Sequence, residues 1–504
     1  MSKNIILCAD GTGNLGGTTP DSNVYKVYKS VKKHLSKEDK SKIDEQIVFY
    51  DNGVGTEKNK YLRMIGGAIG FGFKDNVCDL YKFLARNYEH DDRVYFFGFS
   101  RGASTVRACN GFISVCGLVK GKGLRNADLD MLVKEAFTAY KVHKNDPEKA
   151  EELKKTNRSH GVIDIHFMGI WDTVVALGFP KRTDDTGLFS RIINKIFGLA
   201  EKGLDRIWPH SFYRYKLTKN VAHAYQALAI DDERTAFWPY VWKEKDRNPD
   251  TVEQVWFAGM HSNVGGGYGR SGMASVPLYW MMLRAEKWGL LFNSDETQMA
   301  FEDSNVHSRI YNSRDGFAVF YRYHPREIEK LCKNRIEGNI RLHRSVIERM
   351  NHRTANYAPG HLPGEFEVVE TDVEASPEFR NPGKNPKWAK IREEVNLWVS
   401  RRKKLYATMV TFSLAVFYSA FQLKDASILN STRDGFWGAI ADLFDFFLPD
   451  LFDGLLDFAV YRHPSLFIGA AVLVSFYWWV RRRWQLKTVD ACERLRHLVI
   501  YEDI

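Results

Sequence analysis

Short apolar runs recur through the first half of the chain, each four to eight residues long. They are rich in β-branched and aromatic residues, and most carry no charge, which is typical of strands buried on both faces of a parallel sheet. Between two of them, residues 75–88 repeat apolar positions at helical spacing. This alternation predicts an α/β fold with a mostly parallel sheet. The predicted strands are residues 5–9, 47–50, 94–97, 163–170 and 255–258.

Two further segments depart from this pattern. Residues 178–216 are first polar and then amphipathic, and we expect them to form an insertion over the sheet edge, as a lid. Residues 291–400 are highly charged and mainly helical in pattern. The sequence therefore predicts a catalytic domain over residues 1–290 and a helical or mixed extension over residues 291–400.

The last hundred residues differ from the rest of the chain in containing two long apolar runs. Residues 405–423 contain no charged residue and follow the basic cluster 401–404, and a second apolar run, 465–480, precedes the basic cluster 481–483. At about 1.5 Å per residue, the first run nearly spans a hydrocarbon core roughly 30 Å thick. The acidic, aromatic loop between them contains an amphipathic segment, residues 436–458, suited to a membrane interface.

This charge distribution predicts a transmembrane helix hairpin over residues 401–484, with both ends cytoplasmic, and a cytoplasmic tail over residues 485–504. The alternative is a pair of buried helices in a soluble domain. Basic clusters at the outer ends of charge-free runs favour the membrane. We therefore expect a multi-pass protein of the inner, cytoplasmic membrane with its catalytic domain in the cytoplasm.

Composition excludes several classes of protein. A hydrophobic fraction of 44% and an aromatic fraction of 14% exclude a mainly disordered chain. The formal net charge of +10 is small for 504 residues, so no nucleic-acid partner is expected. The six cysteines form no C-x-x-C pair, and we expect reduced thiols and no metal. No signal-peptide pattern surrounds the first predicted strand.

A candidate nucleophile follows the strand at residues 94–97. The sequence there reads Gly98-Phe99-Ser100-Arg101-Gly102, and a plausible helix continues from it. This is the G-x-S-x-G pattern in its strand–turn–helix context, in which a strained turn exposes the serine and the helix N-terminus faces a developing oxyanion. The alternative is an ordinary tight turn. The context favours Ser100 as the nucleophile of a hydrolase.

A serine nucleophile needs a base and an orienting acid, which follow it in the order acid, then histidine, in this fold. Asp172 follows the strand at 163–170, and His261 follows the strand at 255–258. Three glycines at 265–267 would let the backbone fold closely around the imidazole. Asp231 and Asp232 remain alternative acids, because they follow another apolar run, residues 224–230.

The oxyanion site is predicted from two backbone segments. One donor would be the amide of Arg101, the residue after the nucleophile, and the other would come from the loop after an earlier strand. Residues 10–14, Asp-Gly-Thr-Gly-Asn, close the first strand and suggest Gly11 or Thr12. This loop could equally cradle a phosphate, although it lacks the spacing of a P-loop.

Together these motifs resemble an α/β-hydrolase family, long known only as an uncharacterised domain, that includes the type VI secretion phospholipase effectors. The resemblance covers about residues 3–270 and implies a serine lipase or esterase acting on phospholipid, with Ser100 as nucleophile, Asp172 as acid and His261 as base. The family often has Asp where this chain has Asn263, and the C-terminal hairpin is not one of its general features. The motifs are Asp10-Gly11-Thr12-Gly13-Asn14, Gly53-Val54-Gly55-Thr56, Gly98-Phe99-Ser100-Arg101-Gly102-Ala103, Trp171-Asp172-Thr173, residues 227–234 and residues 259–268.

The resulting hypothesis is a membrane-anchored serine phospholipase that needs no cofactor. Its partners would be a phospholipid membrane and a regulatory protein or further copies of the chain, since an unrestrained lipase would damage its host; this suggests a regulated toxin or defence effector. Two alternatives stay open. One is a membrane-anchored sensor or binding module without turnover, and the other is an esterase acting on soluble esters.

Overall fold

A single parallel sheet organises the part of the chain that the computed structural model describes, which comprises residues 2–11, 14, 16–17, 20–53, 72–174, 212–245, 247–370, 379–423, 433–448 and 450–500. The sheet has eight strands in the order β2-β1-β3-β4-β5-β6-β7-β8, and every neighbouring pair is parallel. The predicted α/β fold is confirmed. The strands are β1 Asn4–Ala9, β2 Gln46–Asp51, β3 Arg93–Phe99, β4 Ile165–Trp171, β5 Val221–Ala229, β6 Val252–Phe257, β7 Ile340–His343 and β8 Phe366–Val369.

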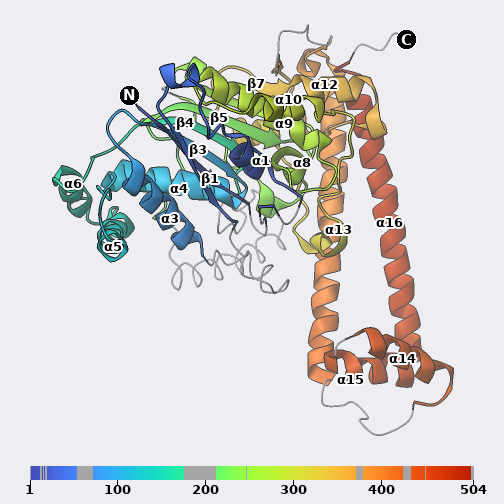
Figure 1. Cartoon of the computed structure of the whole chain (residues 1–504). Coiled ribbons are helices and arrows are strands. Elements are labelled where there is room, and N and C mark those ends of the chain that lie inside the picture. The colour runs from blue at the N-terminus through green and yellow to red at the C-terminus, as the bar shows by residue number, and fades with distance from the viewer. Residues whose placement is uncertain are drawn as a thin grey trace.

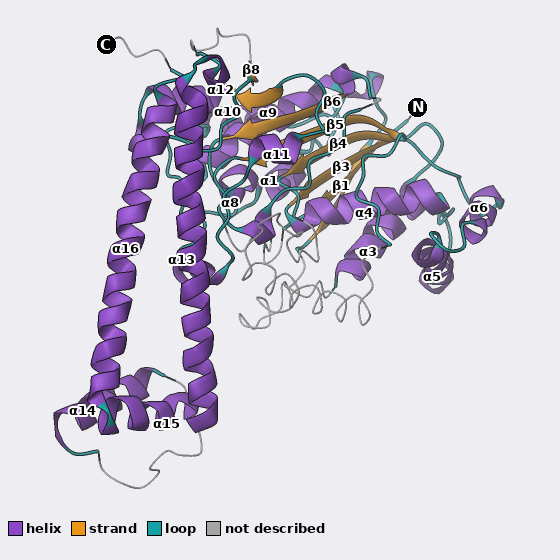
Figure 2. Ribbon diagram, turned by 180° about the vertical axis from the view of Figure 1, so that it is seen from behind, coloured by secondary structure: helices purple, strands orange, loops and turns teal. Residues whose placement is uncertain are grey.

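Helices cover both faces of the sheet, which explains why the central strands are mostly apolar (Figures 1 and 2). Side chains alternate along β1: Ile5 and Leu7 pack into one core, while Ile6 and Cys8 pack into the other. The first core contains residues of α3 (Phe73–Asn87), α4 (Arg101–Cys116) and α5 (Asn126–Val142). The second contains residues of α1 (Asn23–Ser30) and α9 (Gly272–Lys287).

The predicted extension after residue 290 contributes strands to the same sheet. Strands β7 and β8, which lie within the predicted extension, continue the same sheet beyond β6. They are accompanied by α10 (Ser294–Glu302), α11 (Ile328–Cys332) and α12 (Arg344–Asn351). The predicted lid lies outside the described residues from 175 to 211 and stays a prediction; after it, Phe212 and Tyr213 are buried in the first core.

Two long helices stand beside this sheet and extend well past it (Figure 1). They are α13 (Lys387–Leu423) and α16 (Pro464–Arg496), and α14 (Gly435–Phe447) and α15 (Asp453–Leu456) lie at their far ends. Both are longer than the apolar runs because their charged halves continue the helix. Those halves pack on the globular part, where Val395, Val399 and Ala491 form a small core with Tyr323. Within the predicted tail, Ala491 belongs to this core and Ile500 bridges to Phe379.

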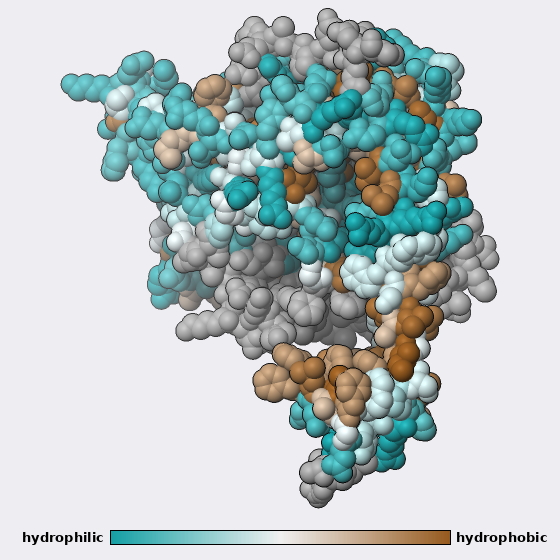
Figure 3. Space-filling view, turned by 90° about the vertical axis from the view of Figure 1, so that its right-hand side faces the viewer, coloured by the Kyte–Doolittle hydropathy of each residue, from teal (hydrophilic) through white to brown (hydrophobic). Residues whose placement is uncertain are grey.

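Within the described residues, α13 and α16 are the helices long and apolar enough to cross a membrane. Only 6% of the most apolar window of α13 is buried, and none of that of α16. Apolar side chains gather on this projecting part, below the largely hydrophilic surface of the globular part (Figure 3). Core helices of a soluble domain would be covered by protein, so this exposure favours membrane association over the buried-helix alternative.

Candidate active site

The turn that carries Ser100 is strained. Ser100 joins β3 to α4 with φ 56° and ψ −120°, a conformation that costs a non-glycine residue about 1–3 kcal/mol. The flanking glycines are required by close contacts. A Cβ on Gly102 would lie 2.0 Å from the carbonyl oxygen of Ala9, and one on Gly98 would lie 2.7 Å from the Cα of Ala103. The G-x-S-x-G pattern therefore reflects the packing of this turn against β1 and α4.

His261 faces the serine from the connection that follows β6. It is the first residue of the short helix α8 (His261–Gly265), shortly after β6, and its Nε2 lies 2.8 Å from Ser100 Oγ. The imidazole is buried between two aromatic rings, with centroid distances of 4.6 Å to Phe99 and 5.0 Å to Phe237. A Cβ on Gly265 would lie 1.9 Å from the Phe99 ring. The absence of a side chain there lets α8 approach the ring that holds the histidine.

Asp172 lies just after β4 and contacts the other ring nitrogen of His261. Its Oδ2 lies 2.5 Å from His261 Nδ1, and the carboxyl group is fully buried. Its Oδ1 accepts a hydrogen bond of 3.0 Å from the Ala229 amide at the end of β5. Like Ser100, Asp172 has a positive φ, of 39°. The carboxyl ends of β3, β4 and β6, in one sheet, thus bring together the three residues predicted for the triad.

Arg326 is a site residue that the sequence did not reveal. Its guanidinium donates to both oxygens of Asp172, with two bonds of 2.7 Å, and it is buried. It also donates to the carbonyl oxygens of Ala229 and Phe237. Arg326 comes from a loop 154 residues after Asp172, with no strand end or motif beside it, so no pattern in the sequence pointed to it.

These contacts determine the protonation states of Asp172 and His261. Burial alone would raise the pKa of Asp172, but the charge of Arg326 and the hydrogen bonds from His261 and Arg326 hold it well below its usual range. Burial lowers the pKa of His261, although the hydrogen bond and charge of Asp172 partly oppose this. At neutral pH, the site therefore contains a carboxylate and a neutral imidazole, the states that a general base requires.

The alternative acids hold the backbone around the histidine and do not contact its ring. Asp231 accepts a hydrogen bond of 2.6 Å from the Gly259 amide and one of 2.8 Å from the Tyr357 hydroxyl, and burial raises its pKa to about 6. Asp232 accepts from the His261 amide at 3.3 Å and pairs with the Arg234 guanidinium at 2.6 Å. Of the three carboxylates, Asp172 has the geometry of the orienting acid.

The oxyanion candidates differ in their surroundings. The Arg101 amide is the first of α4, where backbone N–H groups lack partners within the helix. The Gly11 amide donates to Asp10 Oδ1 at 2.5 Å, which disfavours it as an oxyanion donor, and Thr12 lies outside the described residues. Asp10 also accepts from the Tyr50 hydroxyl at 2.7 Å. A buried carboxyl group in this loop disfavours the alternative of a phosphate cradle.

A parallel α/β sheet with serine, histidine and aspartate in contact at its carboxyl edge defines the class of α/β hydrolases. The family of Tle1-like phospholipase effectors of the type VI secretion system, through its catalytic domain, matches residues 3–284. Because this match spans more than half of the chain, the protein belongs to that family. Membership of this family supports phospholipase activity, and hence hydrolysis of lipid esters.

Two individual proteins show more limited similarity. The uncharacterized protein YEL023C of Saccharomyces cerevisiae is 32% identical over 201 residues, which cover 36% of this chain and 28% of that protein. The chain thus spans less than a third of this relative. The crystal structure of an uncharacterized protein from Pseudomonas aeruginosa aligns with a TM-score of 0.35 and 15% identity, over 81% of this chain and 59% of that one.

Proposed function

We propose that the protein is a membrane-anchored serine phospholipase that cleaves acyl esters with Ser100, His261 and Asp172 as its catalytic triad. The observation that carries this proposal is the unbroken chain of contacts, 2.8 Å from Ser100 Oγ to His261 Nε2 and 2.5 Å from His261 Nδ1 to Asp172 Oδ2. A strained nucleophile turn at the N-terminus of a helix supports the same assignment.

The proposed reaction has two halves. Neutral His261 accepts the hydroxyl proton as Ser100 Oγ attacks the ester carbonyl carbon, and the Arg101 amide donates to the oxyanion. The intermediate then collapses: the C–O bond to the alcohol breaks, and His261 returns the proton to the departing lysophospholipid oxygen. In the second half, His261 deprotonates a water molecule that attacks the acyl-serine, which releases the fatty acid and restores Ser100.

The side chain of Arg101 favours a substrate that carries a phosphate group. Its side chain follows the nucleophile directly and is 8% exposed, and its Nη1 has no hydrogen-bond partner in the described part of the chain. Burial lowers its pKa to about 10, so the guanidinium remains charged at neutral pH. A guanidinium beside the reacting serine suits the phosphodiester of a phospholipid better than a neutral ester.

The hairpin supports a membrane location for this chemistry. Glu233, just after β5, lies 3.7 Å from Arg402 of α13, so the carboxyl edge of the sheet is next to the hairpin. An active site held beside the bilayer would meet its substrate at a high effective concentration. A cytoplasmic catalytic domain, a regulatory partner or homo-oligomer, and a role as toxin or defence effector are further parts of this proposal.

Full-length wild type and Ser100→Ala, purified and reconstituted, would be compared on phosphatidylcholine and phosphatidylethanolamine vesicles by mass spectrometry of the released fatty acid. We expect release by the wild type alone. Equal release from both would refute the proposal. Hydrolysis of short-chain esters without vesicle hydrolysis would favour the soluble-ester alternative. A folded wild type that no fluorophosphonate labels at Ser100 would favour the non-catalytic alternative.

A further inference from the structure

A cavity of about 460 Å³ lies between the globular part and the hairpin. One wall comes from the loop after β5, including Asp231 and Glu233, and from the segment before α11. The other wall comes from the charged halves of α13 and α16, which contribute Arg402 and Arg481. The cavity is therefore formed by the catalytic part and the hairpin together.

The cavity has an excess of cationic side chains. Arg402 and Arg314 both lie over the Tyr323 ring, at 4.3 and 5.0 Å from its centroid. Glu233 is 3.7 Å from Arg402, and Arg481 lines the cavity from α16. Arg326 also lines the cavity, but its charge is balanced by Asp172; Asp231 accepts hydrogen bonds from the neutral Gly259 amide and Tyr357 hydroxyl and keeps its charge. Apart from Arg326, three guanidinium groups thus face two carboxylates, Glu233 and Asp231.

Unpartnered polar atoms occur on the same lining. Tyr323 is 1% exposed and its hydroxyl makes no hydrogen bond within the described residues; the same holds for both ring nitrogens of His361, which is 8% exposed. Arg314 Nε is also buried and unpartnered there. Buried polar groups are normally hydrogen-bonded, so this set indicates a site built for a polar, negatively charged occupant.

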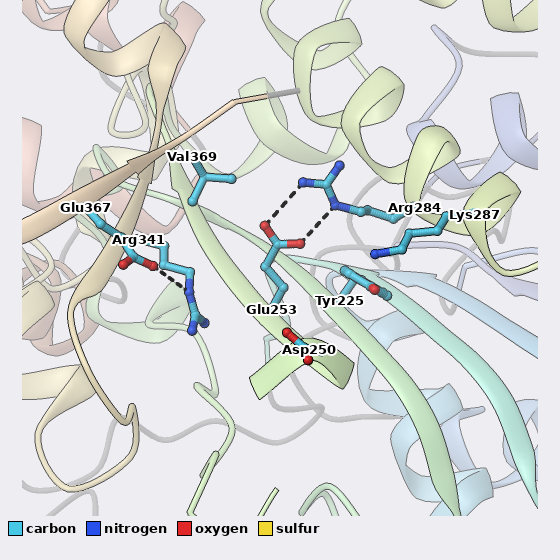
Figure 4. A pocket seen from close by; sticks show the side chains of 8 residues that line it. All are labelled: Tyr225, Asp250, Glu253, Arg284, Lys287, Arg341, Glu367 and Val369. Carbon is cyan, nitrogen blue, oxygen red and sulfur yellow. Dashed lines mark hydrogen bonds and ion pairs between the residues drawn. The ribbon is translucent and has the colours of Figure 1, made fainter. Parts of the chain in front are cut away.

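A second pocket that also contains arginines differs from the first in how they are paired (Figure 4). That pocket, of about 480 Å³, is lined by residues of β5 to β8 and of α9. Its arginines are already paired: Arg284 contacts Glu253 at 2.9 Å, and Arg341 contacts Glu367 at 2.8 Å. Paired charges leave little electrostatic attraction for an anion.

We propose that the cavity between the globular part and the hairpin binds the phosphate of an anionic lipid headgroup, at a site separate from Ser100. Arg402 and Arg481 lie where the charged halves of α13 and α16 meet the apolar stretches at 405–423 and 465–480. With those stretches in a bilayer, this level is that of the headgroups. Guanidinium groups bind phosphate oxygens through charge-assisted hydrogen bonds, and the Tyr323 hydroxyl and neutral His361 supply further donors.

The occupant would also touch groups that hold the triad. Arg326 lines the cavity and donates to Asp172. Asp231 and Glu233 also line it, and Asp232 between them accepts a hydrogen bond from the His261 amide. Binding is therefore expected to influence hydrolysis, and this second part rests on the proposed function. The binding itself does not, and it is tested on protein with Ser100→Ala, so that failure of catalysis and failure of the site are distinguishable.

The test uses the full chain in detergent and monomeric dihexanoyl phosphatidic acid, with thermal unfolding and calorimetry as readouts. The matched pair is Arg481→Gln and Arg482→Gln, which remove the same charge from adjacent positions of α16, while only Arg481 lines the cavity. We expect Arg481→Gln to weaken binding about tenfold and Arg482→Gln to change it less than about twofold. Equal losses would mean unspecific surface attraction and would overturn the proposal.

A further variant separates an effect on lipid binding from an effect on folding. Tyr323→Phe removes only an unpartnered hydroxyl, so we expect an unchanged unfolding temperature without ligand and several-fold weaker lipid binding. Inorganic phosphate and glycerol phosphate distinguish the source of the anion: binding at least about tenfold weaker than that of the lipid supports a headgroup site. Equal binding of inorganic phosphate and lipid would overturn the assignment to lipid, and no binding of any of the three would overturn the site.

Discussion

Arg326 donates two hydrogen bonds of 2.7 Å to the two carboxylate oxygens of Asp172, one to each. This fork fixes both the charge and the orientation of the acid that contacts His261. An isolated carboxylate buried this deeply would tend to take up a proton, and the guanidinium prevents that. The arrangement makes Arg326 a positioning residue for the histidine, acting through Asp172.

Arg326→Lys should therefore lower kcat by about 10–100-fold with little change in KM, because an ammonium group keeps the charge but loses the bidentate geometry. Vesicle hydrolysis measures the effect, and circular dichroism monitors the fold. Arg335→Lys is the matched control, since Arg335 donates to the Val241 carbonyl and makes no contact with the triad. Activity equal to wild type in Arg326→Lys would show that the charge alone suffices.

The choice among the three carboxylates is tested by amide substitutions. Asp172→Asn should lower kcat about 10⁴-fold, because the amide favours the wrong imidazole tautomer. Asp231→Asn should keep activity within about tenfold, because Asp231 contacts the Gly259 amide and Tyr357 and not the imidazole. Both are measured by single-turnover hydrolysis. A larger loss in Asp231→Asn than in Asp172→Asn would reverse the assignment.

The pH dependence follows from the state of His261. A base must be neutral, and burial lowers the pKa of His261, so kcat/KM should be flat at neutral pH and fall only below the ordinary histidine value of about 6.5. Asp172 opposes this lowering of the pKa. In Asp172→Asn, the acid limb of the residual activity should therefore move to lower pH than in the wild type. An acid limb above about pH 7 in the wild type would contradict this.

Sequence patterns located the sheet and the three side chains because each of these residues follows a fully buried strand. Ser100 and Asp172 come directly after β3 and β4, and His261 follows shortly after β6; apolar runs mark these strand ends. Strands β7 and β8 escaped prediction, because they have four residues each and are only partly buried. Arg326 was not predicted for another reason. Its role arises from a tertiary contact between a loop and a strand end that is far away in sequence.

The packing of α8 can be tested with a pair of glycines. Gly265→Ala places a methyl group 1.9 Å from the Phe99 ring, so the helix and His261 must shift, and kcat should fall about 100-fold, with about 1–3 kcal/mol lost in the free energy of unfolding. Gly269→Ala is the control, because its added methyl meets nothing within 4 Å. We expect that variant to stay within about 0.5 kcal/mol of the wild type. Equal behaviour of both variants in chemical denaturation and hydrolysis would argue against this packing role.

The membrane role of the hairpin is testable on side chains that are exposed in the structure. Leu414 in α13 and Val472 in α16 are 64% and 61% exposed. If both helices cross a bilayer, Leu414→Arg with Val472→Arg should reduce the fraction that resists carbonate extraction, because each charge costs about 2.5–3.5 kcal/mol at a helix centre. Met299→Arg, at a 55% exposed position of α10, is the matched control and should change nothing. In a water-exposed hairpin, the double variant would instead remain folded and become more soluble than the wild type, because it replaces exposed apolar side chains with charges.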